Sequence, residues 1–319
     1  MFEMMLMGGS TIRPDWTPSR MVPYTVPGNM YQGINGTVTG MEVANTESFT
    51  PALLITPGEA VPAPNTGKYG RLLTDSMIWQ PLGVESMVGT QAVGVAVDGR
   101  VLFFGGVAGS YNLNVREYTI STSAWANIGT LTGVDGSLNQ ASAARLGDWI
   151  VIAYGRERGS PLGTHLKYHI PTRTVTRLAN LIVDGKPADN GHVLSDGKFI
   201  YMYTTTTYQG GVTVVNRFQK FDPSNNTFTD LASPPKASYS LPCGFADNGR
   251  LLFTGIIDGG VVYTTWMAYN PSNDEWTTWA VPPPTDPYIG KKFAVSNNTL
   301  WVMGNASSSN RACFSVPLA

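Results

Sequence analysis

Residues 94–106 read GVAVDGRVLFFGG, and residues 118–131 read YTISTSAWANIGTL. In the first stretch an Asp-Gly turn joins two apolar runs; in the second, Tyr118 is followed seven positions later by Trp125. Asp-Gly between apolar runs is a strong β-hairpin signal, because a type I′ turn needs positive φ at both central residues. The two stretches therefore predict a small antiparallel sheet of four strands.

The pattern recurs along the chain. Pairs of hydrophobic residues seven positions apart are Leu72–Trp79, Tyr118–Trp125, Tyr168–Val175, Phe221–Phe228 and Tyr269–Trp276. Their second members are 46, 50, 53 and 48 residues apart. Short turns accompany the pairs in phase, at Asp98-Gly99, Gly147-Asp148, Asp196-Gly197, Asn248-Gly249 and Asn297-Asn298. Self-similarity at this period is typical of propellers and solenoids.

An apolar run follows each turn, as expected for a strand buried on both faces. The runs are 100–106, 148–155, 198–204, 250–256 and 299–305. Each repeat is thus interpreted as strand a, turn, strand b, longer loop, strand c, short turn and strand d. Four antiparallel strands per repeat form a propeller blade. The alternative, a β-sandwich or β-helix with chance regularity, does not explain five turns and five pairs in phase.

The sequence predicts an all-β chain: a β-propeller of five four-stranded blades preceded by an extended N-terminal arm. The expected blades cover about 86–131, 139–178, 190–231, 240–280 and 290–319 plus 69–83. A sixth blade built from residues before 69 is left open.

Two further expectations concern the two ends of the chain. The last repeat lacks an outer strand, and MIWQPLG at 77–83 has that pattern, so we expect residues 77–82 to pair with the C-terminal blade. Residues 1–68 hold seven of the twelve methionines and no regular repeat. They are expected to form an arm that packs on the propeller or docks to another subunit; the alternative is a partly disordered tail.

The glycines that end strand b, followed by Tyr-x6-Trp, resemble the kelch motif. The resemblance extends over residues 69–319 and is best at 94–131, where Gly105-Gly106 keeps the double glycine. Val175 and Phe228 replace the tryptophan in two repeats. The resemblance implies a kelch-like β-propeller.

Composition narrows the function. Only 13% of residues are charged, about half the usual share, and the net charge is −1. No basic stripe is available to neutralise phosphates, so nucleic acid is not an expected partner. No apolar run approaches the roughly twenty residues of a membrane span, and the start MFEMMLMGGS lacks the basic region of a secretory signal.

No catalytic constellation stands out. His165 and His169 fall on one face of an expected strand, but no third metal ligand is suggested nearby. No sequence pattern pairs the acidic loop residues, which are Glu157, Asp184, Asp258 and Asp286. We therefore expect no catalytic residue, no metal and no cofactor.

The b–c and d–a loops of a propeller emerge on one face, and here they are long and rich in Tyr, Ser, Gly, Asn and Thr. This composition suits an adaptable recognition surface, although the same residues could simply fill the central funnel. The candidate binding residues are Tyr111, Asn112, Arg156, Arg158, Tyr208, Asp258 and Tyr288.

The low charge, the polar β-rich composition and the arm resemble bacteriophage virion appendages such as tail, collar or head fibre proteins. This resemblance implies a non-enzymatic structural or adhesion subunit, located in the virion and oligomeric in its assembly. Its arm would dock to the particle, and its propeller would present a face to a host glycan or a neighbouring protein. The alternatives are a kelch-type carbohydrate-active enzyme (mutarotase or lyase) and a cytoplasmic kelch protein-interaction module.

Overall fold

The computed structural model describes the backbone of five N-terminal strands, most of the middle of the chain and three C-terminal strands. These residues are 22–25, 38–44, 49–55, 67–73, 78–85, 92–280 (without 109, 137, 139–140, 158–159, 236–242, 248, 255–256, 259–260 and 263–264), 292–296, 299–303 and 312–317. Side chains are described only between 92 and 278. Every regular element in these ranges is a β-strand, and none is a helix.

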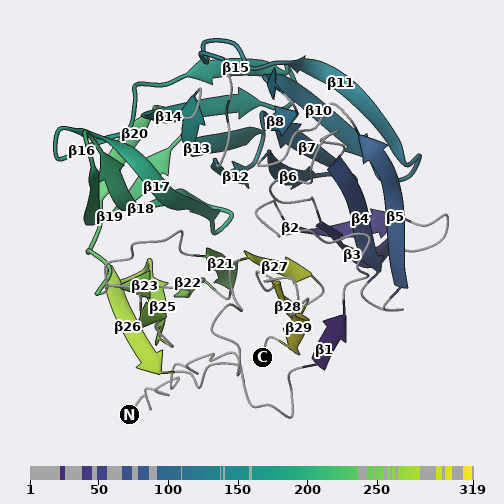
Figure 1. Ribbon diagram of the computed structural model, residues 1–319. Coiled ribbons are helices and arrows are strands. Elements are labelled where there is room, and N and C mark those ends of the chain that lie inside the picture. Colours follow the sequence, from purple (N-terminus) through teal and green to yellow (C-terminus); the bar gives the residue numbers. More distant parts are fainter. Residues whose placement is uncertain are drawn as a thin grey trace, which may run out of the picture.

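The described strands form six antiparallel sheets of four or five strands and two small two-stranded ribbons (Figure 1). Sheet 1 contains β2 (Val38–Ala44), β3 (Phe49–Ile55), β4 (Gly67–Leu73) and β5 (Ile78–Glu85). Sheet 2 contains β6 (Val93–Val97), β7 (Arg100–Phe104), β10 (Asn114–Thr119) and β11 (Ala124–Thr130). Sheet 3 contains β12 (Ser142–Leu146), β13 (Trp149–Glu157), β14 (Ser160–His169) and β15 (Thr174–Arg177).

Sheet 4 has a fifth strand. It contains β16 (Ile182–Val183), β17 (Lys186–Ser195), β18 (Ile200–Tyr208), β19 (Val212–Asp222) and β20 (Thr227–Asp230). Sheet 5 contains β21 (Cys243–Asp247), β22 (Arg250–Thr254), β25 (Thr265–Asn270) and β26 (Glu275–Ala280). Sheet 6 contains β27 (Lys292–Ser296), β28 (Thr299–Met303), β29 (Ala312–Pro317) and β1 (Val22–Thr25). The ribbons are β8 (Val107–Ala108) with β9 (Ser110–Tyr111), and β23 (Ile257–Asp258) with β24 (Val261–Val262).

The hydrophobic pairs of the sequence are cross-strand pairs. Tyr118 lies opposite Trp125, and the other four pairs are likewise directly opposite each other in the last hairpin of their sheets. In sheet 2, Thr119 pairs with Ala124, and the four residues between them form the turn. Tyr118 and Trp125 are the next pair along the hairpin, which is why they are seven positions apart. Ser123, the last turn residue, has a φ of 52°, and Arg173 at the same place in sheet 3 has 57°. The repeat seen in the sequence is therefore a repeated hairpin.

The a–b turns follow the prediction in part. Asp98 and Gly99 have φ values of 41° and 76°, so both adopt the left-handed conformation of a type I′ turn. At Gly147-Asp148 and Asp196-Gly197 only the glycine has positive φ. Asn297-Asn298 lies outside the described residues. The strands that follow the first three turns, β7, β13 and β18, are buried along most of their length, as the apolar runs predicted.

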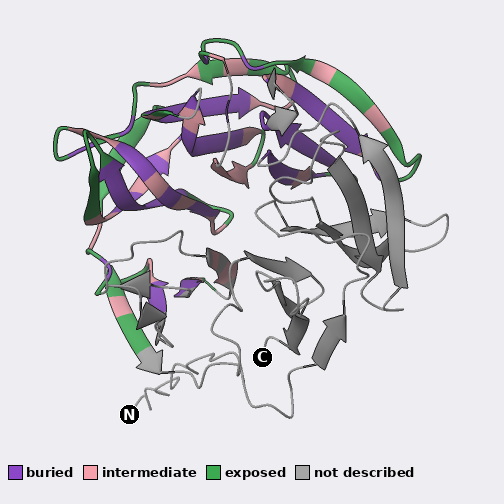
Figure 2. Cartoon of the chain, viewed as in Figure 1, coloured by how far each residue is buried: buried purple, intermediate pink, exposed green. Residues whose placement is uncertain are grey.

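The hydrophobic core lies between neighbouring sheets. Phe104 of sheet 2 meets Tyr168 of sheet 3 with ring centroids 5.1 Å apart. A second cluster joins sheets 3 and 4, and a third joins sheets 4 and 5 through Phe218 and Phe253. Burial is concentrated in the middle strands of the sheets, such as β7, β13 and β18, whereas β11, β15 and β20 are mostly exposed (Figure 2). The described sheets thus stack face against face, each with one outward strand.

The inner strands follow one another around a common centre (Figure 1). β2, β6, β12, β17, β21 and β27 contact one another in this order, and β27 also contacts β2. The succession of sheets therefore curves back on itself.

The strands of sheets 1 and 6 differ from three expectations. The described strands form six large sheets, where five blades were expected. Residues 77–82 do not pair with the C-terminal strands, because β5 pairs with β4 in sheet 1. The strand that completes sheet 6 is β1, in which Val22 lies opposite Ser315. Finally, β1 to β3 and the start of β4 lie within residues 1–68, so part of the expected arm consists of sheet strands.

Candidate functional site

One end of the sheets carries most of the candidate residues. Sheets 2 to 5 each contain a hairpin of an inner strand and the strand after it: β6–β7, β12–β13, β17–β18 and β21–β22. The two strands of a hairpin are antiparallel, so the second strand ends beside the start of the first. We call this the loop end, because the b–c and d–a connections leave from it. Asn112, Arg156 and Tyr208 all lie at the loop end, each in a different sheet or its b–c loop.

The structure does not bring these three residues into contact with one another. Asn112 is buried, and its side-chain oxygen accepts a hydrogen bond from the Asn114 N–H at 2.8 Å, so it holds a turn. Tyr208 is 40% exposed at the end of β18. Of the other candidates, Tyr111 and Asp258 lie in β9 and β23 but their side chains are outside the described part, as are Arg158 and Tyr288 altogether.

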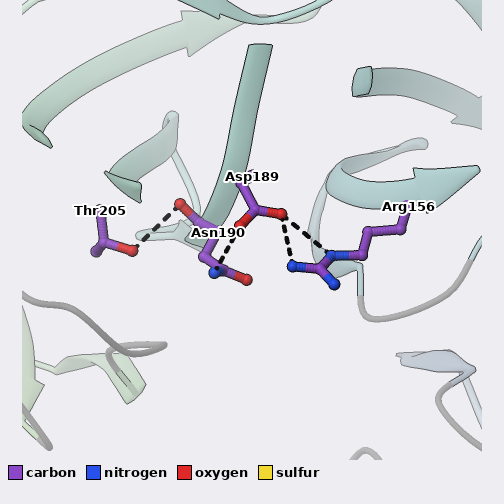
Figure 3. A network of polar contacts seen from close by, with 4 residues as sticks. All are labelled: Arg156, Asp189, Asn190 and Thr205. Carbon is purple, nitrogen blue, oxygen red and sulfur yellow. Dashed lines mark hydrogen bonds and ion pairs between the residues drawn. The ribbon is translucent and has the colours of Figure 1, made fainter. Parts of the chain in front are cut away.

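Arg156 instead pairs with Asp189, which the sequence did not single out (Figure 3). Arg156 is near the end of β13, and Asp189 is near the start of β17 in the next sheet. The Arg156 Nε and Nη2 atoms donate to the same Asp189 oxygen, Oδ1, at 3.1 and 2.8 Å. A charged pair at the loop end therefore bridges sheets 3 and 4.

Two neighbours complete this cluster, which we call the Arg156–Asp189 cluster. The Asn190 side-chain amide donates to Asp189 Oδ2 at 3.1 Å, and the Thr205 hydroxyl donates to the Asn190 carbonyl at 3.2 Å (Figure 3). Asp189 is 1% exposed. A buried carboxylate is tolerated only when it is paired and hydrogen-bonded, and here both oxygens have a partner.

The arginine is the outward part of the cluster. Its side chain is 31% exposed, whereas that of Asp189 is 1% exposed. Arginine carries five N–H donors in a planar fork, and two are directed at Asp189. The remaining donors belong to a partly exposed group held in place by a buried carboxylate. Such a group is suited to hydrogen bonding with a polar ligand.

Glu157, the next residue, has both carboxylate oxygens engaged by donors of the same chain. Arg177 Nη1 lies 2.8 Å from Oε1, Thr164 donates to the same oxygen, and the Asp135 N–H donates to Oε2 at 2.7 Å. Burial acts to raise the pKa of this carboxyl, but these three donors outweigh it and lower the pKa below its usual value. Glu157 is therefore ionised near neutral pH and unsuited to act as a general acid.

A polar chain that sequence reasoning missed links three inner strands. The Val193 N–H donates to Ser142 Oγ at 2.9 Å, Ser142 Oγ is 3.4 Å from His192 Nδ1, and His192 Nε2 is 3.3 Å from the Gly244 carbonyl. With a neutral imidazole, Nε2 donates to the Gly244 carbonyl, which can only accept, and Nδ1 accepts from the Ser142 hydroxyl. The Ser–His contact is longer than a nucleophile–base hydrogen bond. The chain is best understood as a cross-link between β12, β17 and β21.

The two histidines considered as metal ligands have separate environments. His165 is fully buried against the rings of Phe221 and Phe228, with centroids 4.8 and 5.2 Å away. Neither of its ring nitrogens has a hydrogen-bond partner among the described residues. His169 Nδ1 lies 2.8 Å from the Thr172 hydroxyl. No group of three His, Cys, Asp or Glu side chains gathers anywhere in the described part of the chain.

No family model matches the sequence, and no curated protein matches it. None of the described residues lies in a helix long and apolar enough to cross a membrane.

Proposed function

We propose that the chain is a six-bladed, kelch-like β-propeller that binds a partner without catalysing a reaction. Support for the ring comes from the six large sheets and from the inner-strand contacts, which include β27 against β2. A closed ring also gives β1 a clear role. It supplies the outer strand of sheet 6, so that the first and last parts of the chain complete one blade.

The partner is a polar, hydroxyl-rich ligand, for which a glycan of a host surface is the best example, bound at the loop end. The chain would act as a structural or adhesion subunit of a tailed-phage virion. Because β1 to β4 belong to sheets, the segment left for docking to the particle is residues 1–21. The composition supports this role: 13% charged residues and a net charge of −1.

The observation that carries the binding proposal is the Arg156–Asp189 cluster. A buried aspartate fixes the orientation of a partly exposed guanidinium, which leaves donors in a set geometry. Because Asp189 neutralises the arginine, a neutral ligand with several hydroxyl groups suits the cluster better than a strong anion. A few fixed polar groups of this kind determine the orientation and specificity of a small ligand.

The test is binding of the purified full-length protein to an array of bacterial surface glycans. For a glycan that is retained, Arg156→Lys keeps the charge beside Asp189 but loses the planar fork. We expect its affinity to fall about tenfold, which corresponds to about 1.4 kcal/mol. Asn190→Ala should weaken binding in the same direction.

A matched control lies at the opposite end of the sheets. Arg145 Nη1 and Nη2 bind the two oxygens of Asp98 at 2.8 and 2.9 Å, and this pair also joins sheets 2 and 3. Because Asp98 is 69% exposed whereas Asp189 is buried, Arg145→Lys should lower the melting temperature less than Arg156→Lys, and it should leave glycan affinity unchanged. Equal losses of affinity in the two variants, or an array with no retained glycan, would contradict the proposal.

A further inference from the structure

The side-chain amide of Asn190 has a fixed orientation at the loop end. Its nitrogen donates to Asp189 Oδ2 at 3.1 Å (Figure 3). An ionised carboxylate can only accept hydrogen bonds, so the amide nitrogen faces Asp189 and the amide oxygen, Oδ1, is directed away from it. Asn190 is partly exposed. Its oxygen is therefore an acceptor whose position is set by a buried carboxylate.

The Arg156–Asp189 cluster thus presents a donor and an acceptor close together. Arg156 and Asn190 bind the two oxygens of the same carboxylate, so their polar groups are neighbours (Figure 3). Arg156 keeps N–H donors beyond the two that Asp189 receives. A ligand group that accepts at one atom and donates at an adjacent atom fits this pair. A secondary amide is such a group, with one C=O and one N–H.

An apolar surface begins in the same row of sheet 4. Asn190 of β17 lies opposite Thr206 of β18, and Thr206 lies opposite Val214 of β19. Directly opposite residues point to the same side of a sheet. Thr206 is fully buried, whereas Val214 is 37% exposed. Since neighbouring strands are about 4.8 Å apart, this row spans about 10 Å from the amide to the valine.

Two more exposed apolar side chains extend this surface. Tyr208 and Val212 lie opposite each other, two residues nearer the tip of the β18–β19 hairpin, so they point to the same side as Val214. They are 40 and 42% exposed. Lys186 Nζ donates to Thr213 Oγ1 at 3.0 Å, but Thr213 points to the other side of β19. We call Tyr208, Val212 and Val214 the Tyr208 surface.

We propose that the glycan bound at the loop end presents a 2-acetamido sugar. Arg156 donates to the acetamido oxygen, and Asn190 Oδ1 accepts from its N–H. The Tyr208 surface receives the acetyl methyl group and the C–H face of the sugar ring, since tyrosine and valine side chains present apolar area. The inference rests on the proposed function, because it names the sugar for which that site is selective.

Two properties of the site favour this sugar over others. Arg156 is paired with Asp189, so an uncharged acetamido group fits better than a sugar acid. An unsubstituted hexose supplies hydroxyl groups for the cluster but no methyl group for the Tyr208 surface. Small-ligand sites commonly combine apolar side chains with a few placed polar groups. Here the two parts adjoin on one sheet.

The test is ligand-observed NMR titration of the full-length protein with two matched pairs of sugars. The pairs are N-acetylglucosamine with glucose and N-acetylgalactosamine with galactose, which differ in the acetamido group. Wild type should bind at least one acetylated sugar at least about tenfold more tightly than its parent, because a site that hydrogen-bonds a group rejects an analogue without it. Saturation transfer should be strongest at the acetyl methyl group.

Two variants test the apolar part of the site. Tyr208→Ala and Val214→Ser should each reduce the preference for the acetylated sugar at least about fivefold. Phe199→Ala is the matched control. Phe199 is a 37% exposed aromatic residue at the opposite end of the same sheet, beside the first residue of β18. Its removal should leave the preference unchanged.

The outcomes separate this inference from the glycan proposal. Equal binding of each acetylated sugar and its parent, or binding of none of the four, would overturn the inference. So would an acetyl-lysine peptide that binds as tightly as the acetylated sugars. Glycans without acetamido groups that are retained on the array would then leave the proposed function standing. An array with no retained glycan would contradict the proposed function itself.

Discussion

His165 is the residue whose chemistry is most at odds with its surroundings. It is 0% exposed, lies against two phenylalanine rings, and has no hydrogen-bond partner among the described residues for either ring nitrogen. Burial lowers its pKa to about 4, from an ordinary value of 6.5. The imidazole is thus held neutral, and it packs as an aromatic ring against Phe221 and Phe228.

This environment makes stability depend on pH. Below pH 6.5 the unfolded chain binds a proton at His165 that the folded chain does not, so stability is lost as pH falls from 6.5 to 4. Because one pKa unit corresponds to about 1.4 kcal/mol, the loss from this group is on the order of 3 kcal/mol. Carboxylates also titrate in this range, so the comparison needs a variant that lacks only the imidazole.

We therefore predict that His165→Leu becomes more stable relative to wild type as the pH is lowered. Urea unfolding of both proteins at pH 7, 5.5 and 4.5 measures the difference. Its change from pH 7 to 4.5 should be about 2–3 kcal/mol in favour of leucine. A difference that stays constant with pH would show that His165 can take up its proton in the folded state.

At the scale of elements, the match between sequence and structure is best within hairpins. Tyr118–Trp125 and its four counterparts were predictable because both members of each pair lie in one hairpin, where the turn length fixes their spacing. The Arg156–Asp189 cluster was not predictable as a unit. Its two charged residues are 33 positions apart in different sheets, and only packing of sheet on sheet brings them together.

Packing between sheets also explains one glycine that no local rule demands. Tyr154 has a φ of 64° at a bulge in β13, and its ring reaches sheet 4, where its hydroxyl lies 3.1 Å from Thr204 Oγ1. Gly191 in β17 lies under that ring. A Cβ atom at Gly191 would be 2.4 Å from the Tyr154 ring and 2.5 Å from the Tyr203 carbonyl oxygen.

Gly191→Ala should therefore destabilise the fold by about 1–3 kcal/mol or more, as overpacking of a tight core does. Gly129→Ala is the matched control, since Gly129 also lies in a strand but a Cβ there would meet nothing within 4 Å. Chemical denaturation of the two variants measures the difference. Equal stability would mean that Tyr154 moves aside without loss.

At the scale of the whole molecule, the number of sheets was the feature that could not be predicted from the sequence. Leu72–Trp79 was found as a pair, but the strands before it, β2 and β3, are joined by residues 45–48 (NTES) rather than by a two-residue glycine turn. Without that signal the segment was interpreted as an arm, and β5 as the closing strand. The strand that does complete sheet 6, β1, is four residues long. Four residues carry too little pattern to identify a strand.

The role of β1 leads to a prediction on truncation. Removal of residues 1–21 leaves β1 intact, whereas removal of residues 1–25 deletes the strand that pairs with Ala312–Ser315 of β29. The second truncation gives up the β1–β29 backbone hydrogen bonds and exposes an edge that can pair with other chains. We expect it to lower the melting temperature by about 5 °C or more and to cause aggregation on heating, while the first keeps the wild-type melting temperature. Scanning calorimetry with light scattering distinguishes the two. The same melting temperature in both truncations would mean that β1 adds nothing to closure, and the arm would then again be the better description of the N-terminal segment.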